Sequence, residues 1–371
     1  MSCPIELDPP QWNSVTEGHL GKLLIPRALQ NYISSVFTKL GWHEEKTPFR
    51  GTTPIGDIDF TNLIYTFDPS APRKIILAAH FDSKWFPDSP ANQFIGATDS
   101  AAPVAMILHL VEFLTPLLNE RKNRIEKGLG ILKEEENFDE EELSETTIQI
   151  VLFDGEEAFK DWTDTDSIYG ARHLAELWSS TYLDSSHSVY RSKNKRRLSP
   201  EPTILNTIDH LILLDLLGNK HSMIYSYFRE TDWLHSKMKQ VDDKLKNEKL
   251  IEIEPNEDLW FSNFRMSGGI GDDHLPFLHR GVSIFHVISN PFPKVWHTLG
   301  DDASVLSLPA LRRWNRILRV FTCEYLGLSP TTDMKTKKSE YTRSNEDLVG
   351  LRFNFEFIKL PKLMDSKDSR S

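Results

Sequence analysis

The sequence predicts an α/β fold in which a mixed, mostly parallel central β-sheet is flanked by helices. Apolar runs of strand length, rich in branched residues, alternate along the chain with longer stretches of helical period. This alternation is typical of parallel sheets covered by helices on both faces. The strand-like runs are residues 75–79, 148–153, 211–214 and 282–285, and the helix-like stretches are residues 26–40, 101–118, 167–178, 233–245 and 308–326.

Three further segments fit around this framework. Residues 55–67 alternate apolar and polar side chains, as an amphipathic strand does, and we expect this strand at an edge of the sheet. The charged stretches at 120–145, which includes an acidic run, and at 190–202, which is basic, are predicted to be solvated loops.

The framework occupies residues 26–330, which we expect to form a single globular domain. Residues 1–25 are then an N-terminal extension, and residues 331–371 a C-terminal extension with a strand-like stretch at 351–360.

The N-terminal residues contain no apolar run long enough for a membrane span or a signal sequence, so we expect no membrane association. The chain also lacks an Asn-x-Ser/Thr sequon. These features favour a cytoplasmic location, or a secretory one if a leader was removed.

Composition excludes some classes of function. The chain has 43 Lys and Arg against 54 Asp and Glu, a formal net charge of -11, which argues against binding to nucleic-acid phosphates. Only two cysteines occur, Cys3 and Cys323, so neither a disulfide framework nor a cysteine-rich zinc module can form. Any metal must therefore be bound by histidines and carboxylates.

Acids and histidines gather at the ends of the predicted strands. Open α/β sheets bind ligands beyond the carboxyl ends of their strands, so we expect these side chains to lie near one another. Buried charges need partners, and zinc suits a mixed shell of histidine and carboxylate ligands. The residues are His80, Asp82, Asp99, Glu156, Glu157, Asp215, Asp272, Asp273, His286 and His297.

Several of these residues stand in blocks that resemble the glutaminyl cyclases in order and content, from about Pro26 to Gly327. The resemblance implies a fold like that of the zinc aminopeptidases, to which the cyclases are related. It also implies an enzyme that converts the N-terminal glutamine of peptides or proteins to pyroglutamate and releases ammonia. The blocks are AAHFDSKWF (78–86), IGATDSAAP (95–103), LFDGEEAFKDW (152–162), DSIYGARHL (166–174), LLDLLG (213–218), GGIGDDHLPFLHRGV (268–282) and NPFPKVWHT (290–298).

The resemblance assigns the metal ligands position by position. It places one zinc ion per chain on Asp99, Glu157 and His297, and three protein ligands leave a fourth position open, as catalytic zinc sites require. The zinc is expected to polarise the amide carbonyl of the substrate. Glu156 is then the proton carrier between the attacking amine and the departing ammonia.

The resemblance also implies a hydrogen-bond network around Glu156. Its expected members are the acids Asp215 and Asp272, which we count among the catalytic residues, together with Ser100 and His286. Two neighbouring acids raise each other's pKa, so we expect one of them to keep its proton.

Apolar side chains are expected to form the wall of the substrate pocket. Gly271 departs from the family pattern, because this position often carries a side chain. The predicted substrate-binding residues are Trp162, Ile270, Gly271, Phe292 and Trp296.

For Asp273 and His274 we favour capping of a helix start ahead of Pro276 over a catalytic role.

A zinc aminopeptidase with one or two zinc ions is the alternative function. His80 and Asp82 form the His-x-Asp pair that supplies a second metal site in two-zinc aminopeptidases, and we regard His80 as a possible remnant of that site. The DSAAP turn, the placement of Trp162 six residues after Glu156, and the FPKVWH block favour the cyclase. An inactive binding relative is a third hypothesis.

The resemblance also has a gap. Many secreted animal cyclases carry a disulfide at two positions that Ala79 and Val104 occupy here, so this disulfide is missing, which again favours a cytoplasmic location.

Overall fold

The computed structural model describes residues 27–86, 94–131, 140–190, 201–220, 223–253 and 259–328. Within them, one mixed sheet has the strand order β1-β2-β4-β3-β5-β8. Neighbours among β4, β3, β5 and β8 pair in parallel, whereas β1 and β2 form an antiparallel hairpin that joins the sheet at β4. The predicted fold class is thus confirmed. The strands are β1 (His43–Thr53), β2 (Gly56–Thr66), β3 (Arg73–His80), β4 (Thr146–Phe153), β5 (Ile208–Asp215) and β8 (Ile284–Ile288).

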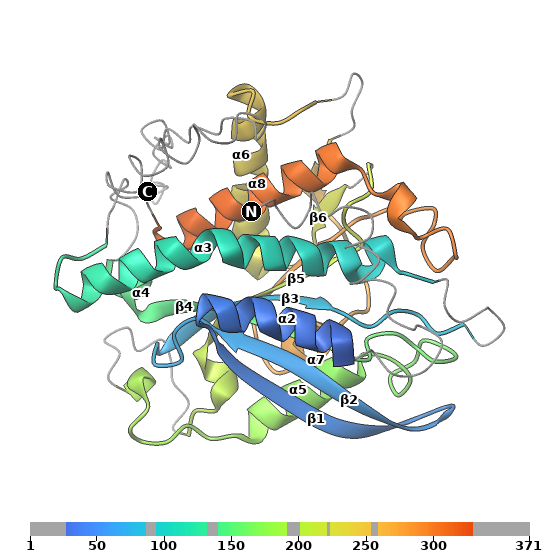
Figure 1. The fold of residues 1–371 in the computed structure, drawn as a ribbon, viewed down its shortest axis with the longest axis horizontal. Helices are drawn as coiled ribbons and strands as arrows, with labels where there is room; N and C mark the ends of the chain where they lie inside the picture. Colours follow the sequence, from blue (N-terminus) through green and yellow to red (C-terminus); the bar gives the residue numbers. More distant parts are fainter. Residues whose placement is uncertain are drawn as a thin grey trace, which may run out of the picture.

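Helices cover both faces of this sheet (Figure 1). One face packs against α2 (Arg27–Leu40), α3 (Ala102–Glu126), α6 (Asp232–Asn247) and α8 (Leu308–Leu326). The other face packs against α5 (Tyr169–Ser180) and the single turn α7 (Leu275–Leu278). A short helix, α4 (Glu140–Glu145), leads into β4, and a small parallel pair is formed by β6 (Ile224–Ser226) and β7 (Phe261–Arg265).

The apolar runs of the parallel strands are explained by burial on both faces. In β3, Ile75 and Leu77 pack into the core under α3, whereas Ile76 and Ala78 pack into the core over α5. All four side chains are at most 4% exposed. Because successive side chains of a strand point to opposite faces, a strand covered on both sides needs apolar residues at every position.

Helix α3 is the central helix of the larger core. Together with the turn before it, residues Ala97–Glu126 are long and apolar enough to cross a membrane by composition alone. However, 78% of the apolar window is buried inside the fold. The helix packs against α8 and α2, and Met106, Ile107 and Val111 are fully enclosed. Its apolar character is therefore accounted for by its place in the core.

The edge strand was assigned to the wrong segment. Residues 55–67 correspond to β2, which lies between β1 and β4, so the sheet ends at β1 instead. The sequence HEEKTPFRGTT of β1 gave no strand signal, because only Thr47 and Thr53 of this strand are buried. A strand with so little buried surface has no apolar period to detect.

The predicted acidic loop at 120–145 is also partly wrong, since α3 continues to Glu126 and α4 begins at Glu140. The end of α3 is fixed by Arg121, whose guanidinium donates to the carbonyl oxygens of Thr146 and Leu326. Most of the acidic run, the basic stretch 191–200, the N-terminal extension and the C-terminal extension with its strand-like stretch 351–360 lie outside the described residues.

Candidate active site

Three side chains far apart in the sequence converge beyond the carboxyl ends of the parallel strands. Asp99 lies in the π-helical turn η2 (Ala97–Ala101), Glu157 follows β4 and His297 follows β8. One donor atom of each lies within 4.8 Å of the others. The Nε2 atom of His297 is 3.3 Å from Oε1 of Glu157 and 3.5 Å from Oδ2 of Asp99. These are the three residues that the resemblance assigns to zinc.

Three of the four carboxylate oxygens of this group are unusual in having no hydrogen bonds. Oδ2 of Asp99 and both side-chain oxygens of Glu157 are buried and have no hydrogen-bond partner. Burial and the nearby charge of Glu157 raise the pKa of Asp99 well above its ordinary value. Two crowded, buried carboxylates are unfavourable unless a cation holds them together. Two carboxylates and an imidazole fit zinc in both donor type and number.

Local backbone geometry places these ligands. Gly96 has a φ of 61°, and a Cβ atom there would lie 2.3 Å from the carbonyl oxygen of Asp99, so the turn into η2 requires glycine. Gly155, between β4 and Glu156, has a φ of 73° and would clash with Phe60 if it carried a side chain. His297 itself has a φ of 53°. A left-handed conformation is costly for a residue with a Cβ and is found most often at functional sites.

Asp82 holds the turn that carries the two glutamates. Its Oδ1 accepts the backbone N-H of Glu156 at 3.1 Å, and its Oδ2 accepts that of Glu157 at 3.2 Å. The backbone oxygen of Asp82 lies 3.1 Å from Nδ1 of His80. Asp82 thus ties the end of β3 to the turn after β4, a role that the sequence did not reveal.

A second group of donor atoms, from His80, Asp99 and Asp215, also lies within 4.8 Å. Here the side chains contact one another directly, with Nε2 of His80 3.0 Å from Oδ1 of Asp99 and 3.4 Å from Oδ1 of Asp215. Burial lowers the pKa of His80, but Glu156 and the other surrounding carboxylates raise it well above its ordinary value. The donors of a second metal site are therefore present, but they are hydrogen-bonded to each other.

The expected hydrogen-bond network consists of two separate pairs. The hydroxyl of Ser100 donates to Asp215, and Nε2 of His286 lies 2.7 Å from Oδ2 of Asp272. The pKa values of the two acids move in opposite directions. Burial raises the pKa of Asp272 despite the His286 contact, whereas hydrogen bonds from His80 and Ser100 outweigh burial and lower that of Asp215. Asp272 is thus the better candidate for the acid that keeps its proton.

Two details of this region differ from the sequence predictions. His286 does not follow its strand but lies inside β8, paired with Leu213, because the strand continues to Ile288. Asp273 and His274 do not cap α7, since neither side chain bonds a backbone N-H of that turn. Both are fully buried, and the ring of His274 packs against that of His286 with centroids 4.4 Å apart. Packing beneath the site has replaced capping at both positions.

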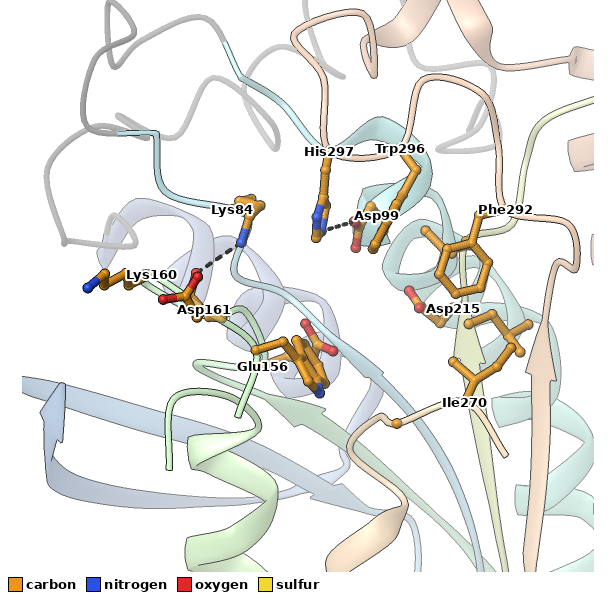
Figure 2. Close-up of a pocket in the computed structure, with 15 residues that line it drawn as sticks. Lys84, Asp99, Glu156, Lys160, Asp161, Asp215, Ile270, Phe292, Trp296 and His297 are labelled. Atoms are coloured by element: carbon orange, nitrogen blue, oxygen red, sulfur yellow. Dashed lines mark hydrogen bonds and ion pairs between the residues drawn. The ribbon is translucent and has the colours of Figure 1, made fainter. Parts of the chain in front are cut away.

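Glu156 lines a pocket next to the convergent ligands (Figure 2). It is 6% exposed, and it belongs to none of the three groups of potential metal-ligand atoms found among the described residues. Burial raises the pKa of Glu156 well above its ordinary value, and the neighbouring Glu157 adds to this effect, while His80 opposes it. A carboxyl group with a raised pKa can both accept and donate a proton near neutral pH.

The pocket has a volume of about 390 Å³, and all five predicted substrate-binding residues line it. Phe292 and Trp296 meet edge to face, with ring centroids 4.8 Å apart, and Trp296 stacks on His297 at 3.8 Å. Trp162 lines the pocket beside Gly271 and is 45% exposed. A Cβ atom at Gly271 would lie 3.3 Å from Nε1 of Trp162, so the lack of a side chain at Gly271 lets the indole of Trp162 pack closely against its backbone.

Lys84 is a pocket residue that sequence reasoning missed, although it lies in the AAHFDSKWF block. Its ammonium group donates to the carbonyl oxygen of Ala158 at 3.0 Å and lies 3.5 Å from Oε2 of Glu157. His297 approaches the other oxygen, Oε1. The two contacts fix the orientation of the Glu157 carboxylate.

Asp166 organises the loop that carries Trp162. Its carboxylate accepts the backbone N-H groups of Phe159, Lys160 and Asp161 at 2.9 to 3.1 Å and the hydroxyl of Tyr169 at 2.8 Å. Burial alone would raise the pKa of Asp166, but these hydrogen bonds outweigh it and lower the pKa below its ordinary value.

We expect Asp166→Asn to destabilise the protein by about 1 to 3 kcal/mol at neutral pH, because three backbone N-H groups lose their charged acceptor. A carboxyl group with a lowered folded-state pKa stabilises the fold above its unfolded-state pKa of about 3.9, and this contribution is lost as the pH falls through the folded-state value. The deficit of the variant should therefore shrink in acid. Urea unfolding between pH 7 and pH 3 measures it. Asp164→Asn, on the exposed part of the same loop, is the control, and an equal deficit in both variants would contradict this assignment.

A mixed sheet whose parallel strands end in buried carboxylates and histidines around a pocket defines an α/β protein with a candidate metal site. Residues 62–322 match the family described as "Peptidase family M28". A solved Zn-dependent exopeptidase from Parabacteroides distasonis has the same fold, with a TM-score of 0.57 at 18% identity over 85% of this chain and 94% of the other.

More similar proteins narrow this class. The chain is 37% identical over 311 residues to the glutaminyl-peptide cyclotransferase-like protein of Mus musculus, covering 84% of this chain and 72% of the relative. The crystal structure of Macrostomum lignano glutaminyl cyclase superposes with a TM-score of 0.69 at 32% identity, over 88% of this chain and 92% of the other. The chain therefore belongs to the glutaminyl-peptide cyclotransferase family, within peptidase family M28. The resemblance inferred from the sequence blocks is confirmed.

Proposed function

We propose that this protein is a zinc-dependent cyclotransferase that converts the N-terminal glutamine of peptides or proteins to pyroglutamate. The observation that carries this proposal is the convergence of Asp99, Glu157 and His297, with three carboxylate oxygens that accept no hydrogen bond, beside Glu156 in an aromatic-walled pocket. Membership of the cyclotransferase family supports the same reaction.

The reaction is an intramolecular acyl transfer. The α-amine nitrogen of the substrate forms a bond to the side-chain amide carbon, and the bond from this carbon to the amide nitrogen breaks. One proton passes from the attacking amine to the departing nitrogen, which leaves as ammonia, and no water is consumed. Because the attack closes a five-membered ring, the enzyme has to hold the glutamine in a folded-back conformation in which the amine lies next to the amide carbon.

Asp99, Glu157 and His297 are proposed to hold one zinc ion, with a fourth position open towards the pocket. When bound, the ion supplies Lewis-acid polarisation of the amide carbonyl. Lys84 supports this site, since it lies within ion-pair distance of Oε2 of Glu157.

Glu156 is proposed to accept the proton of the α-amine and to deliver it to the departing nitrogen. A single carboxyl group can do both when it lies within reach of each nitrogen and has a pKa near the working pH. Asp272, paired with His286, and Asp215, paired with Ser100, are proposed to support Glu156 through the surrounding hydrogen bonds. Asp272 is the member that we expect to stay protonated.

The pocket walls are proposed to hold the glutamine side chain. A volume of about 390 Å³ leaves room for one glutamine and part of the following residue. Phe292 and Trp296 form one wall (Figure 2), and Trp162, Ile270 and Gly271 also line the pocket.

The alternative function is a zinc aminopeptidase, which the presence of His80, Asp99 and Asp215 as a second donor group keeps open. Two observations favour the cyclase with one ion. The donor atoms of the second group are hydrogen-bonded to one another or to Ser100, whereas Oδ2 of Asp99 and both oxygens of Glu157 in the first group accept no hydrogen bond.

Incubation with a glutamine-initiated dipeptide tests the proposed function. We expect release of ammonia, a product lighter than the substrate by the mass of ammonia, and loss of both after treatment with a zinc chelator. A leucine-initiated dipeptide is the matched control and should be left intact. Free amino acids from either dipeptide would instead identify an aminopeptidase, and an absence of any product would refute both functions.

A further inference from the structure

Asp301 is a buried acid for which the proposed reaction has no role. It lies four residues after His297, in the segment between β8 and α8, and its side chain is completely enclosed. It belongs to none of the groups of potential ligand atoms found among the described residues.

The side-chain contacts of Asp301 go to Thr98, the residue that precedes Asp99, and to the backbone N-H of Asp99 itself. Oδ1 accepts the backbone N-H of Thr98 at 2.9 Å. The hydroxyl of Thr98 lies 3.0 Å from Oδ1 and 3.1 Å from Oδ2. The main chain adds a parallel contact, because the carbonyl oxygen of Asp301 accepts the N-H of Ala97 at 3.0 Å. These bonds join two turns that are 203 positions apart in the sequence.

The two turns are the ones that carry Asp99 and His297. The His297 turn lies outside the sheet, so the strand ladder does not fix its distance from η2. Within the turn, the N-H of Asp301 donates to the carbonyl oxygen of Thr298 at 3.0 Å, which couples Asp301 to the backbone next to His297. A displacement of either turn would change the 3.5 Å separation of His297 Nε2 from Asp99 Oδ2.

We propose that Asp301 is a positioning residue, which clamps the His297 turn to the Asp99 turn and so sets the geometry of the metal site. The inference rests on the proposed function only for the identity of the ion. It parallels the contact of Asp82 with the turn of Glu156 and Glu157, since in both cases a carboxylate that is no ligand accepts backbone N-H groups of a ligand-bearing turn.

The zinc affinity of the purified protein measures this role without reference to catalysis. We expect Asp301→Ala to weaken zinc binding about 10- to 100-fold in competition with a fluorescent chelator, the usual effect of losing an outer partner of a metal ligand. Excess zinc should restore the activity of the variant. Asp302→Ala is the matched control, because Asp302 is the next residue and caps a separate turn through the N-H of Ser304.

Thr98→Val provides a second, milder variant that keeps the shape and the backbone N-H while it removes the hydroxyl contact. We expect a smaller loss of affinity from it, and a loss in the double variant with Asp301→Ala that is less than the product of the two single losses. If Asp301→Ala does not fold, the zinc affinity of Thr98→Val alone tests the inference, and an affinity equal to that of the wild type would then overturn it.

Wild-type zinc affinity in a folded Asp301→Ala variant, or an equal loss in Asp302→Ala, would overturn the inference. A lower melting temperature of the metal-free protein with unchanged affinity would do the same, since it would show a role in stability only. Failure of the proposed function would be recognised by a different measurement, the assay with the dipeptide. The wild-type protein would then release no ammonia from the dipeptide, whatever the zinc affinities of the variants.

Discussion

Glu156→Gln is expected to lower kcat by about 10²- to 10⁴-fold, the usual contribution of a positioned general acid-base group. Glutamine has nearly the same shape as glutamate but cannot take the proton from the attacking amine. Zinc should remain bound in the variant, because Glu156 is not among the convergent ligand atoms. Steady-state kinetics with a glutamine-initiated dipeptide, together with metal analysis of the same sample, measures both properties.

Glu176→Gln is the matched control for this experiment, since Glu176 is an exposed acid on α5 and is expected to have no effect. A Glu156→Gln variant whose kcat stays within about tenfold of the wild type would remove Glu156 from the acid-base role. A variant that loses zinc as well as activity would move Glu156 into the ligand set.

Glu157→Gln is expected to lose the zinc ion, in contrast to Glu156→Gln, which should lose activity while zinc stays bound. The change removes the charged donor that faces His297 and leaves the ammonium of Lys84 without its carboxylate. Loss of an outer partner of a ligand typically weakens metal binding about 10- to 100-fold, so loss of a ligand should weaken it more. We expect activity at background and a zinc content well below that of the wild type after dialysis.

Excess zinc separates the two variants. It should return part of the activity of Glu157→Gln, because the proton carrier is intact, and none of the activity of Glu156→Gln. Full zinc content in Glu157→Gln after dialysis would contradict the assigned ligand set.

The fold was predictable where burial leaves a pattern in the sequence. The parallel strands are covered on both faces and therefore appear as continuous apolar runs, and α8 was located at its observed bounds, 308–326. Strand β1 could not be found, because its side chains are mostly exposed and it is held by the hairpin with β2. Backbone hydrogen bonds between strands leave no trace in side-chain composition.

The site was predictable to the extent that its residues lie in recognisable blocks. Periodicity could place Asp99, Glu157 and His297 near strand ends, but only the resemblance could group them. The turn-holding roles of Asp82 and Asp301 were not predicted, because an acid that binds backbone N-H groups looks in sequence like any surface acid. Their partners become visible only in three dimensions.

Asp273 and His274 illustrate the opposite error. An acid ahead of a proline at a helix start is a common capping pattern, so local sequence favoured that role. In the structure both side chains are buried beneath the site, and α7 has a single turn with little need of a cap. Tertiary packing overrides local preference when a helix is this short.

The location of zinc in crystals of the zinc-loaded protein tests the central claim most directly. Anomalous diffraction at the zinc absorption edge should show one strong peak per chain, about 2.0 to 2.2 Å from donor atoms of Asp99, Glu157 and His297. A peak bound by His80 and Asp215 in place of this group, or two peaks of equal strength, would contradict the account of a single-zinc cyclotransferase.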